Sequence, residues 1–151
     1  MVARGDALGE LAQLALLEHL VELGRARVVR DPGDAVVIAW GAMVPVACDA
    51  ADELAARRGA QVGVVDLRTL APLDVETVVS VAERAGRVVV VHEAPLTGGF
   101  GAEVVATLQE EAFYSLEAPI RRVAGYDLPA PVPLVEDWCR PDVARVVAAL
   151  E

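Results

Sequence analysis

Short apolar runs separated by turn residues recur along this chain. The four valines of Val88–Val91 form the strongest run, and Gln61–Leu67 is apolar at nearly every position. Continuous apolar runs of this length are typical of strands that are buried on both faces, as in a parallel sheet. The expected strands are Ala26–Arg30, Ala35–Trp40, Gln61–Leu67, Arg87–His92 and Ile120–Ala124.

Longer stretches with apolar residues three and four positions apart predict helices between these strands. One of them is bounded by clear signals, since Asp74 can cap its start and Gly86 can close it. Alternation of strands and helices indicates an open, mostly parallel α/β sheet. The expected helices are Asp6–Leu23, Val44–Arg58, Asp74–Ala85, Ala102–Tyr114 and Pro141–Leu150, with an irregular stretch around Pro129, Pro131 and Pro133.

Composition and charge narrow the classes of function. The chain has 151 residues, enough for one domain with a real core, and a formal net charge of -10. This charge argues against a nucleic-acid partner and is compatible with a basic protein partner. All basic residues are arginine, so Schiff-base and P-loop chemistry, which need lysine, are excluded. No apolar run reaches the length of a membrane span, and two distant cysteines, Cys48 and Cys139, favour a cytoplasmic location.

Candidate chemistry is concentrated after the valine run. His92 and Glu93 follow it, and ligands of open α/β sheets bind beyond the carboxyl ends of the strands, so either side chain could face a cleft. The alternative is that His92 only orders a neighbouring loop. The loop of Gly98, Gly99, Phe100 and Gly101 could hold a phosphate at a helix start, or its glycines could allow close backbone packing, which we favour. We find no catalytic triad and no metal-ligand spacing.

Five sequence segments, in their order and spacing, together resemble the C-terminal domain of the beta subunit of 2-oxo acid dehydrogenases. This domain is of the transketolase C-terminal type. The resemblance covers about residues 24–150. The segments are Gly24–Arg30, Gly41–Val44, Val65–Asp74, Gly86–Pro95 and Gly98–Glu103. Three further stretches, Gln109–Phe113, Leu116–Ile120 and Gly125–Pro129, are similar to the branched-chain type, although pyruvate and acetoin dehydrogenase subunits share much of this pattern.

This resemblance implies a three-layer α/β/α sandwich over residues 24–151, with one antiparallel edge strand, the first, and a helical extension over residues 1–23. The complete enzymes of the family use thiamine diphosphate and Mg²⁺ to decarboxylate a 2-oxo acid and then acylate a lipoyl group. The family's cofactor ligands and catalytic glutamate lie outside the matching region, so none is carried over to this chain. We therefore expect the chain alone neither to bind thiamine diphosphate tightly nor to turn over substrate.

The resemblance also implies an assembly role. The expected partners are the alpha subunit, a beta-type mate in a possible homodimer, and the small, basic peripheral subunit-binding domain of the dihydrolipoyl acyltransferase. Glu117 and the C-terminal Glu151 are candidates to meet an arginine of that domain; alternatively they are solvated surface charges. A different hypothesis is a free-standing ligand-binding or regulatory module with a site at His92 and Glu93. The predicted helix Asp6–Leu23 could cover a face or form a dimer contact.

Overall fold

A computed structural model of the chain describes residues 21–128 and 136–151, without the side chain of Glu136. Most of the expected helix Asp6–Leu23 and the stretch from Pro129 to Pro133 therefore lie outside the described residues. Val21 and Glu22 have no regular structure, and Leu23 lies in a turn, so the helix does not extend to Leu23 as expected. The turn ends at Gly24, which has a positive φ of 76° and precedes the first strand by three positions.

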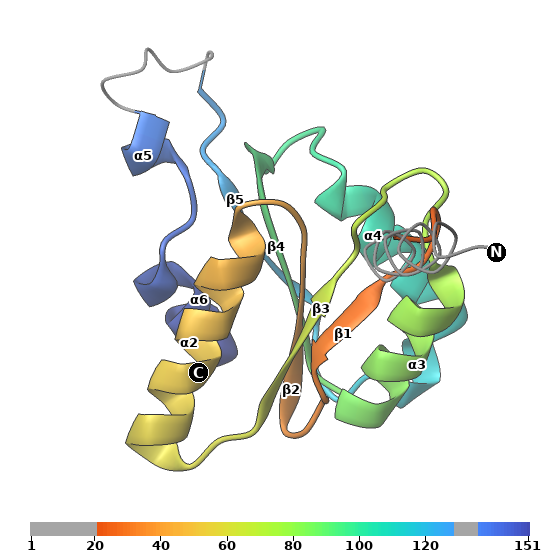
Figure 1. Cartoon of the computed structure of the whole chain (residues 1–151), viewed down its shortest axis with the longest axis horizontal. Helices are drawn as coiled ribbons and strands as arrows, with labels where there is room; N and C mark the ends of the chain where they lie inside the picture. Colours follow the sequence, from red (N-terminus) through yellow and green to blue (C-terminus); the bar gives the residue numbers. More distant parts are fainter. Residues whose placement is uncertain (1–20, 129–135) are drawn as a thin grey trace, which may run out of the picture.

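Five strands form a single sheet in the order β1-β3-β2-β4-β5 (Figure 1). Strand β1 pairs antiparallel with β3, and the other three pairs are parallel, which confirms the predicted mostly parallel sheet with an antiparallel first strand at one edge. The strands are β1 (Arg27–Arg30), β2 (Ala35–Ala39), β3 (Val62–Asp66), β4 (Val88–Pro95) and β5 (Arg121–Gly125).

Helices cover both faces of this sheet, and the result is the predicted three-layer sandwich (Figure 1). On one face α2 (Met43–Arg58) and α6 (Val143–Leu150) pack against alternate strand residues such as Val37 and Val91. On the other face α3 (Val75–Ala85) and α4 (Gly101–Glu111) pack against the intervening residues, such as Ile38 and Val90. The central strands are buried on both sides because both sets of side chains are apolar.

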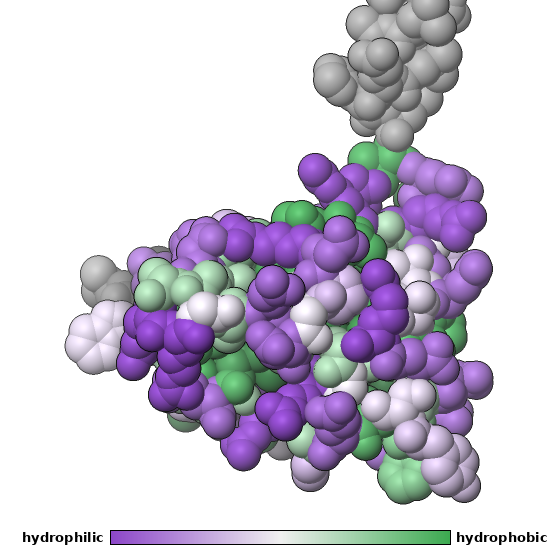
Figure 2. Space-filling model, turned by 90° about the horizontal axis from the view of Figure 1, so that it is seen from below, coloured by the Kyte–Doolittle hydropathy of each residue, from purple (hydrophilic) through white to green (hydrophobic). Residues whose placement is uncertain are grey.

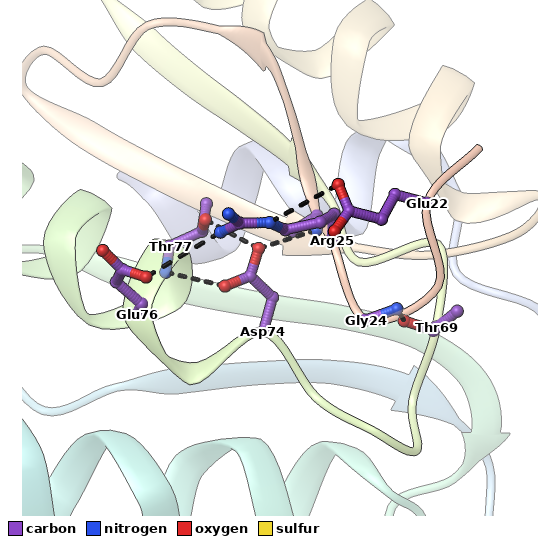
Figure 3. A network of polar contacts seen from close by, with 8 residues as sticks. Glu22, Gly24, Arg25, Thr69, Asp74, Glu76 and Thr77 are labelled. Atoms are coloured by element: carbon purple, nitrogen blue, oxygen red, sulfur yellow. Dashed lines mark hydrogen bonds and ion pairs between the residues drawn. The ribbon is translucent and has the colours of Figure 1, made fainter. Parts of the chain in front are cut away.

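A buried carboxylate fixes the start of α3 to the chain before β1 (Figure 3). Asp74 is 6% exposed and accepts hydrogen bonds from the backbone N–H of Ala26 (2.9 Å) and of Thr77 (3.1 Å), and from the Thr77 hydroxyl (2.7 Å). Burial alone would raise the pKa of Asp74, but these hydrogen bonds outweigh it, and the pKa lies below its usual value. Asp74 is thus the predicted N-cap of α3, and it also links α3 to the segment before β1 by a hydrogen bond.

Three further element boundaries differ from the sequence prediction by two residues or more. Strand β4 continues to Pro95 rather than ending at His92, because Pro95 pairs with Gly125 of β5. The helix expected over Ala102–Tyr114 ends at Glu111 and is followed by a short 3-10 helix, η1 (Phe113–Ser115). Helix α6 begins at Val143, because Asp142 caps it through a hydrogen bond from the Arg145 N–H, and a short helix α5 (Glu136–Cys139) precedes it.

Within the part of the chain that the structure describes, no helix combines the length and the apolar character needed to cross a lipid bilayer.

Candidate functional site

The connections of β2 and β4 define where a ligand site is expected. These two parallel strands are neighbours, but the chain leaves β2 for α2 on one face and leaves β4 for α4 on the other. In open α/β sheets such a reversal opens a crevice at the carboxyl ends of the strands, where ligands bind. His92, Glu93 and the loop Gly98–Gly101 all lie at this end of the sheet, as the sequence predicted.

An aromatic stack lies at this end of the sheet. The His92 ring is 0% exposed and lies parallel to the indole of Trp40, with ring centroids 5.3 Å apart and an interplanar angle of 4°. The Phe100 ring meets the same indole edge-on, at 6.1 Å and 85°. Aromatic rings at these separations attract each other beyond the effect of burial. His92 therefore lies in the interior in this structure, and a ligand role for it stays a prediction that requires its ring to become accessible.

Two glycines of the loop make room for the His92 ring. A Cβ atom on Gly101 would overlap the Cδ2 and Nε2 atoms of the ring, and one on Gly99 would lie 2.7 Å from Cε1. Both separations are shorter than side-chain contacts allow, so only glycine permits this approach of the α4 start to β4. The close approach of these glycines is therefore to a strand of the same chain. Gly98 has open space around it and a φ of 73°.

The environment of His92 disfavours its charged form. Neither ring nitrogen has a hydrogen-bond partner among the described residues. Burial lowers the pKa of His92, and the positive charge of Arg122 lowers it further, against a smaller opposite effect from the Ala94 backbone. The imidazole is therefore neutral near pH 7 and held by packing alone, which does not favour a role as a proton donor at that pH.

Glu93, unlike His92, faces outward. Its carboxylate Oε1 lies 3.4 Å from Nη1 of Arg140, and the same guanidinium also bonds Asp137 on α5. The carboxylate is 43% exposed, so this ion pair contributes little to stability. Glu93 and Arg140 thus form a solvent-accessible charged pair beside the buried stack.

The other two candidate residues lie at the opposite end of the sheet. Glu117 donates its backbone N–H to the carbonyl of Gly86 (2.8 Å), and its carboxylate is 3.4 Å from Nε of Arg87, just before β4 begins. The Glu151 carboxylate lies 2.7 Å from Arg58 at the end of α2. Arg87 and Glu151 both line a pocket of about 240 Å³ beside the first residues of β2 and β4. Seen from this end, the surface is mostly hydrophilic with apolar patches between the charged groups (Figure 2).

The predicted interface residues therefore form two separate groups. Gly98–Gly101 lies at the carboxyl ends of the parallel strands, and Glu117 and Glu151 lie near their amino ends. The sequence analysis did not single out two arginines, Arg122 on β5 and Arg145 on α6, which line a common hollow. The sequence does contain a feature that could have identified them, because each is a charged residue within an otherwise apolar pattern in a predicted strand or helix.

The described residues offer no carboxylate and imidazole cluster for a metal. No group of three or more His, Cys, Asp or Glu side chains in residues 21–128 and 136–151 is placed to hold an ion.

Comparison with known families and structures supports the architecture described above. The family model "Transketolase, C-terminal domain" matches residues 24–146. A solved structure titled "Split gene transketolase, inactive beta4 tetramer" superposes with a TM-score of 0.73 at 32% identity, over 86% of this chain and 41% of that chain.

Two curated relatives are beta subunits of different dehydrogenases. The pyruvate dehydrogenase E1 component subunit beta of Leifsonia xyli is 46% identical over 135 residues, 89% of this chain and 40% of its own length. The mitochondrial 2-oxoisovalerate dehydrogenase subunit beta of Dictyostelium discoideum is 46% identical over 125 residues, 83% of this chain and 34% of its own length. The chain thus spans about 40% or less of these two relatives.

Proposed function

The chain belongs to the transketolase C-terminal domain family, and from that premise we propose that it is a non-catalytic assembly and docking domain of a 2-oxo acid dehydrogenase. In this proposal it joins an alpha subunit and a beta-type mate and contributes to docking of the acyltransferase. The complete enzyme would carry thiamine diphosphate and Mg²⁺ on other parts of the assembly. The observation that carries the proposal is the match of residues 24–146 to this domain, together with the identity to dehydrogenase beta subunits over most of the chain.

The docking surface that we propose is the end of the sheet that carries Glu117 and Glu151. Both carboxylates are at present paired within the chain, Glu117 with Arg87 and Glu151 with Arg58. The Glu117–Arg87 pair is 3.4 Å long and its side chains are 65% and 63% exposed, so it contributes little and exchanges easily. An arginine of a basic partner could replace Arg87 at Glu117 while the net charge of -10 speeds its approach.

For the substrate we propose the branched-chain type. Support comes from the strings Gln109–Phe113, Leu116–Ile120 and Gly125–Pro129, and from the relative that acts as a 2-oxoisovalerate dehydrogenase subunit. The pyruvate-type relative has the same identity of 46%, so the assay must compare both acids. An assembly that contains this chain is expected to decarboxylate 2-oxoisovalerate with a higher kcat/KM than pyruvate; a preference for pyruvate would contradict the branched-chain assignment.

We also propose that the chain works in the cytoplasm, since the two cysteines, Cys48 and Cys139, are both free thiols. The alternative of a ligand-binding module at His92 and Glu93 stays a prediction, and it requires the His92 ring, which is buried against Trp40, to become accessible.

The docking proposal is tested by titrating the chain with a peripheral subunit-binding domain at low and at high salt. Removing one charge by Glu117→Gln is expected to weaken binding at least 5-fold at low salt and to reduce its salt dependence, as for a contact between opposite charges. Glu110→Gln on α4 is a matched control, because it removes the same charge from an exposed position on another element. Equal weakening by both variants would mean that only the overall charge matters, and would contradict the proposed surface.

A further inference from the structure

Two hollows lie along the free edge of the sheet, between β5 and α6. One has a volume of about 450 Å³ and the other about 280 Å³. Arg122 and Arg145 line both of them, and Arg121 lines the larger one as well. Three guanidinium groups are thus gathered on one edge of an acidic protein.

Arg145 is held rigidly, with donor capacity left over. Its Nη2 donates to the carbonyl of Ala124 at 2.6 Å, and its guanidinium carbon lies 4.6 Å above the centroid of the Tyr126 ring. Its Nη1 is buried and has no hydrogen-bond partner among the described residues. An unpaired buried donor on a charged group is costly, and such groups in folded proteins usually meet a partner, a water molecule or a ligand.

These three arginines form no ion pair with the described residues. Arg122 donates from Nη1 to the Leu96 carbonyl at 2.8 Å. No carboxylate of the described residues lies within 4.0 Å of Arg121, Arg122 or Arg145, whereas seven other described arginines do form ion pairs. Residues 129–135, which follow this edge in the chain, contain no Asp or Glu.

One carboxylate does line the smaller hollow, but it is engaged elsewhere. Asp127 accepts from the Thr97 N–H (2.8 Å) with one oxygen and from the Thr97 hydroxyl (2.6 Å) with the other. Counting Arg122, Arg145 and Asp127, this hollow keeps an excess of one positive charge, and Arg121 adds a second from the neighbouring hollow.

We propose that Arg122 and Arg145 form a binding site for a small oxyanion, namely the carboxylate or phosphate group of a small molecule. Planar guanidinium groups match both groups geometrically and bind them with charge-assisted hydrogen bonds. The volume of about 280 Å³ is just below the usual range of small-molecule pockets, which suits a compact anion better than a nucleotide. The unpaired Nη1 of Arg145 is buried, so the guanidinium must turn to present this donor to the anion.

The test is titration of the ¹⁵N-labelled full chain with sodium phosphate and, separately, with sodium malonate, at constant ionic strength set by sodium chloride. We expect saturable shifts of the Ala124 and Tyr126 amides with a millimolar Kd. The anion that binds more tightly assigns the site to phosphate esters or to carboxylates. Shifts that fail to saturate, or that saturate only at other residues, would overturn the proposal.

Arg122→Gln and Arg145→Gln are each expected to weaken binding at least tenfold. Arg27→Gln is the matched control, because Arg27 lies on β1 at the opposite edge of the sheet and likewise forms no ion pair among the described residues; it should change Kd less than twofold. If Arg145→Gln fails to fold because the Ala124 carbonyl loses its donor, Arg122→Gln decides. Equal weakening by Arg27→Gln would show attraction by overall charge alone and would refute a built site.

Discussion

Replacing Gly101 by alanine directly tests the packing of the His92 stack. The new methyl group would overlap two atoms of the His92 ring, which cannot swing away easily because it lies flat against Trp40. Gly101 is the first residue of α4 and has no positive φ, so the backbone itself accepts alanine. The cost of Gly101→Ala therefore comes from the collision with His92 and from no other contact of comparable closeness.

The expected magnitude follows from two opposing effects. Overpacking a filled core costs about 1–3 kcal/mol, whereas alanine in place of glycine stabilises a helix by up to about 1 kcal/mol, and by less in its first turn. We therefore expect Gly101→Ala to lower the free energy of unfolding by about 1–2 kcal/mol. In a domain of 151 residues this corresponds to a fall in Tm of about 2–8 °C.

The assay is denaturant unfolding of four proteins: the parent, Gly101→Ala, His92→Ala and the double variant. His92→Ala removes the ring and costs about 2–3 kcal/mol through the cavity that it leaves. In that background the alanine methyl at position 101 enters empty space, so the double variant should be more stable than the sum of the two single losses predicts, by at least 1 kcal/mol. Gly98→Ala is the control, since its Cβ meets nothing within 4 Å and its cost arises only from the positive φ.

Two results would refute this reasoning. If Gly101→Ala is neutral or stabilising, the ring and the loop do not pack as described. If the Gly101→Ala and His92→Ala losses add within about 0.5 kcal/mol, as expected for Gly98→Ala and His92→Ala, the two residues do not share a contact.

Four further predictions concern single residues. Asp74→Ala removes the α3 cap and leaves the Ala26 N–H without its acceptor, so the free energy of unfolding measured in urea should fall by about 2–4 kcal/mol. A loss below 1 kcal/mol would contradict the stabilising role of these hydrogen bonds. Because the pKa of Asp74 lies below its usual 3.8, its contribution is present above that value and is lost as the pH falls further, and Asp74→Asn should lack this part of the acid dependence. The pKa of folded His92 lies below its usual 6.5, so on acidification the unfolded chain binds a proton before the folded chain does. The free energy of unfolding should therefore fall as the pH drops below 6.5, and the His92→Phe variant should lose that part of the pH dependence. An unchanged pH profile of unfolding in this variant would contradict a buried neutral ring. Asp142→Ala should cost about 1 kcal/mol through the lost α6 cap, measured by thermal unfolding, with no effect expected at the distant α3.

The sequence predicts the structure correctly where residues close together in the chain favour the same element. Helix α3 has the expected bounds because Asp74 caps it through Thr77 and Gly86 ends it in a left-handed conformation with φ of 67°. The valine run predicted a doubly buried strand, and Val88–Val91 are indeed buried. Each of these features depends on residues close together in the chain, whose propensities agree with the final packing.

The rest depended on contacts between distant positions. The extension of β4 to Pro95 is set by its pairing with Gly125 of β5. The burial of His92 requires Trp40, which lies one strand away in the sheet and far away in sequence. Likewise, the composition could not indicate that Glu151 would pair with Arg58, or that Arg145 would meet Tyr126.

The central claim is that this chain is a docking and assembly domain, and light scattering tests it most directly. The chain is measured alone and mixed with the peripheral subunit-binding domain of a branched-chain acyltransferase, at low and at high salt. The account predicts a stoichiometric complex at low salt that dissociates as the salt concentration rises and is weakened by Glu117→Gln. A folded chain that forms no such complex, or one that is indifferent to both salt and Glu117→Gln, would contradict it.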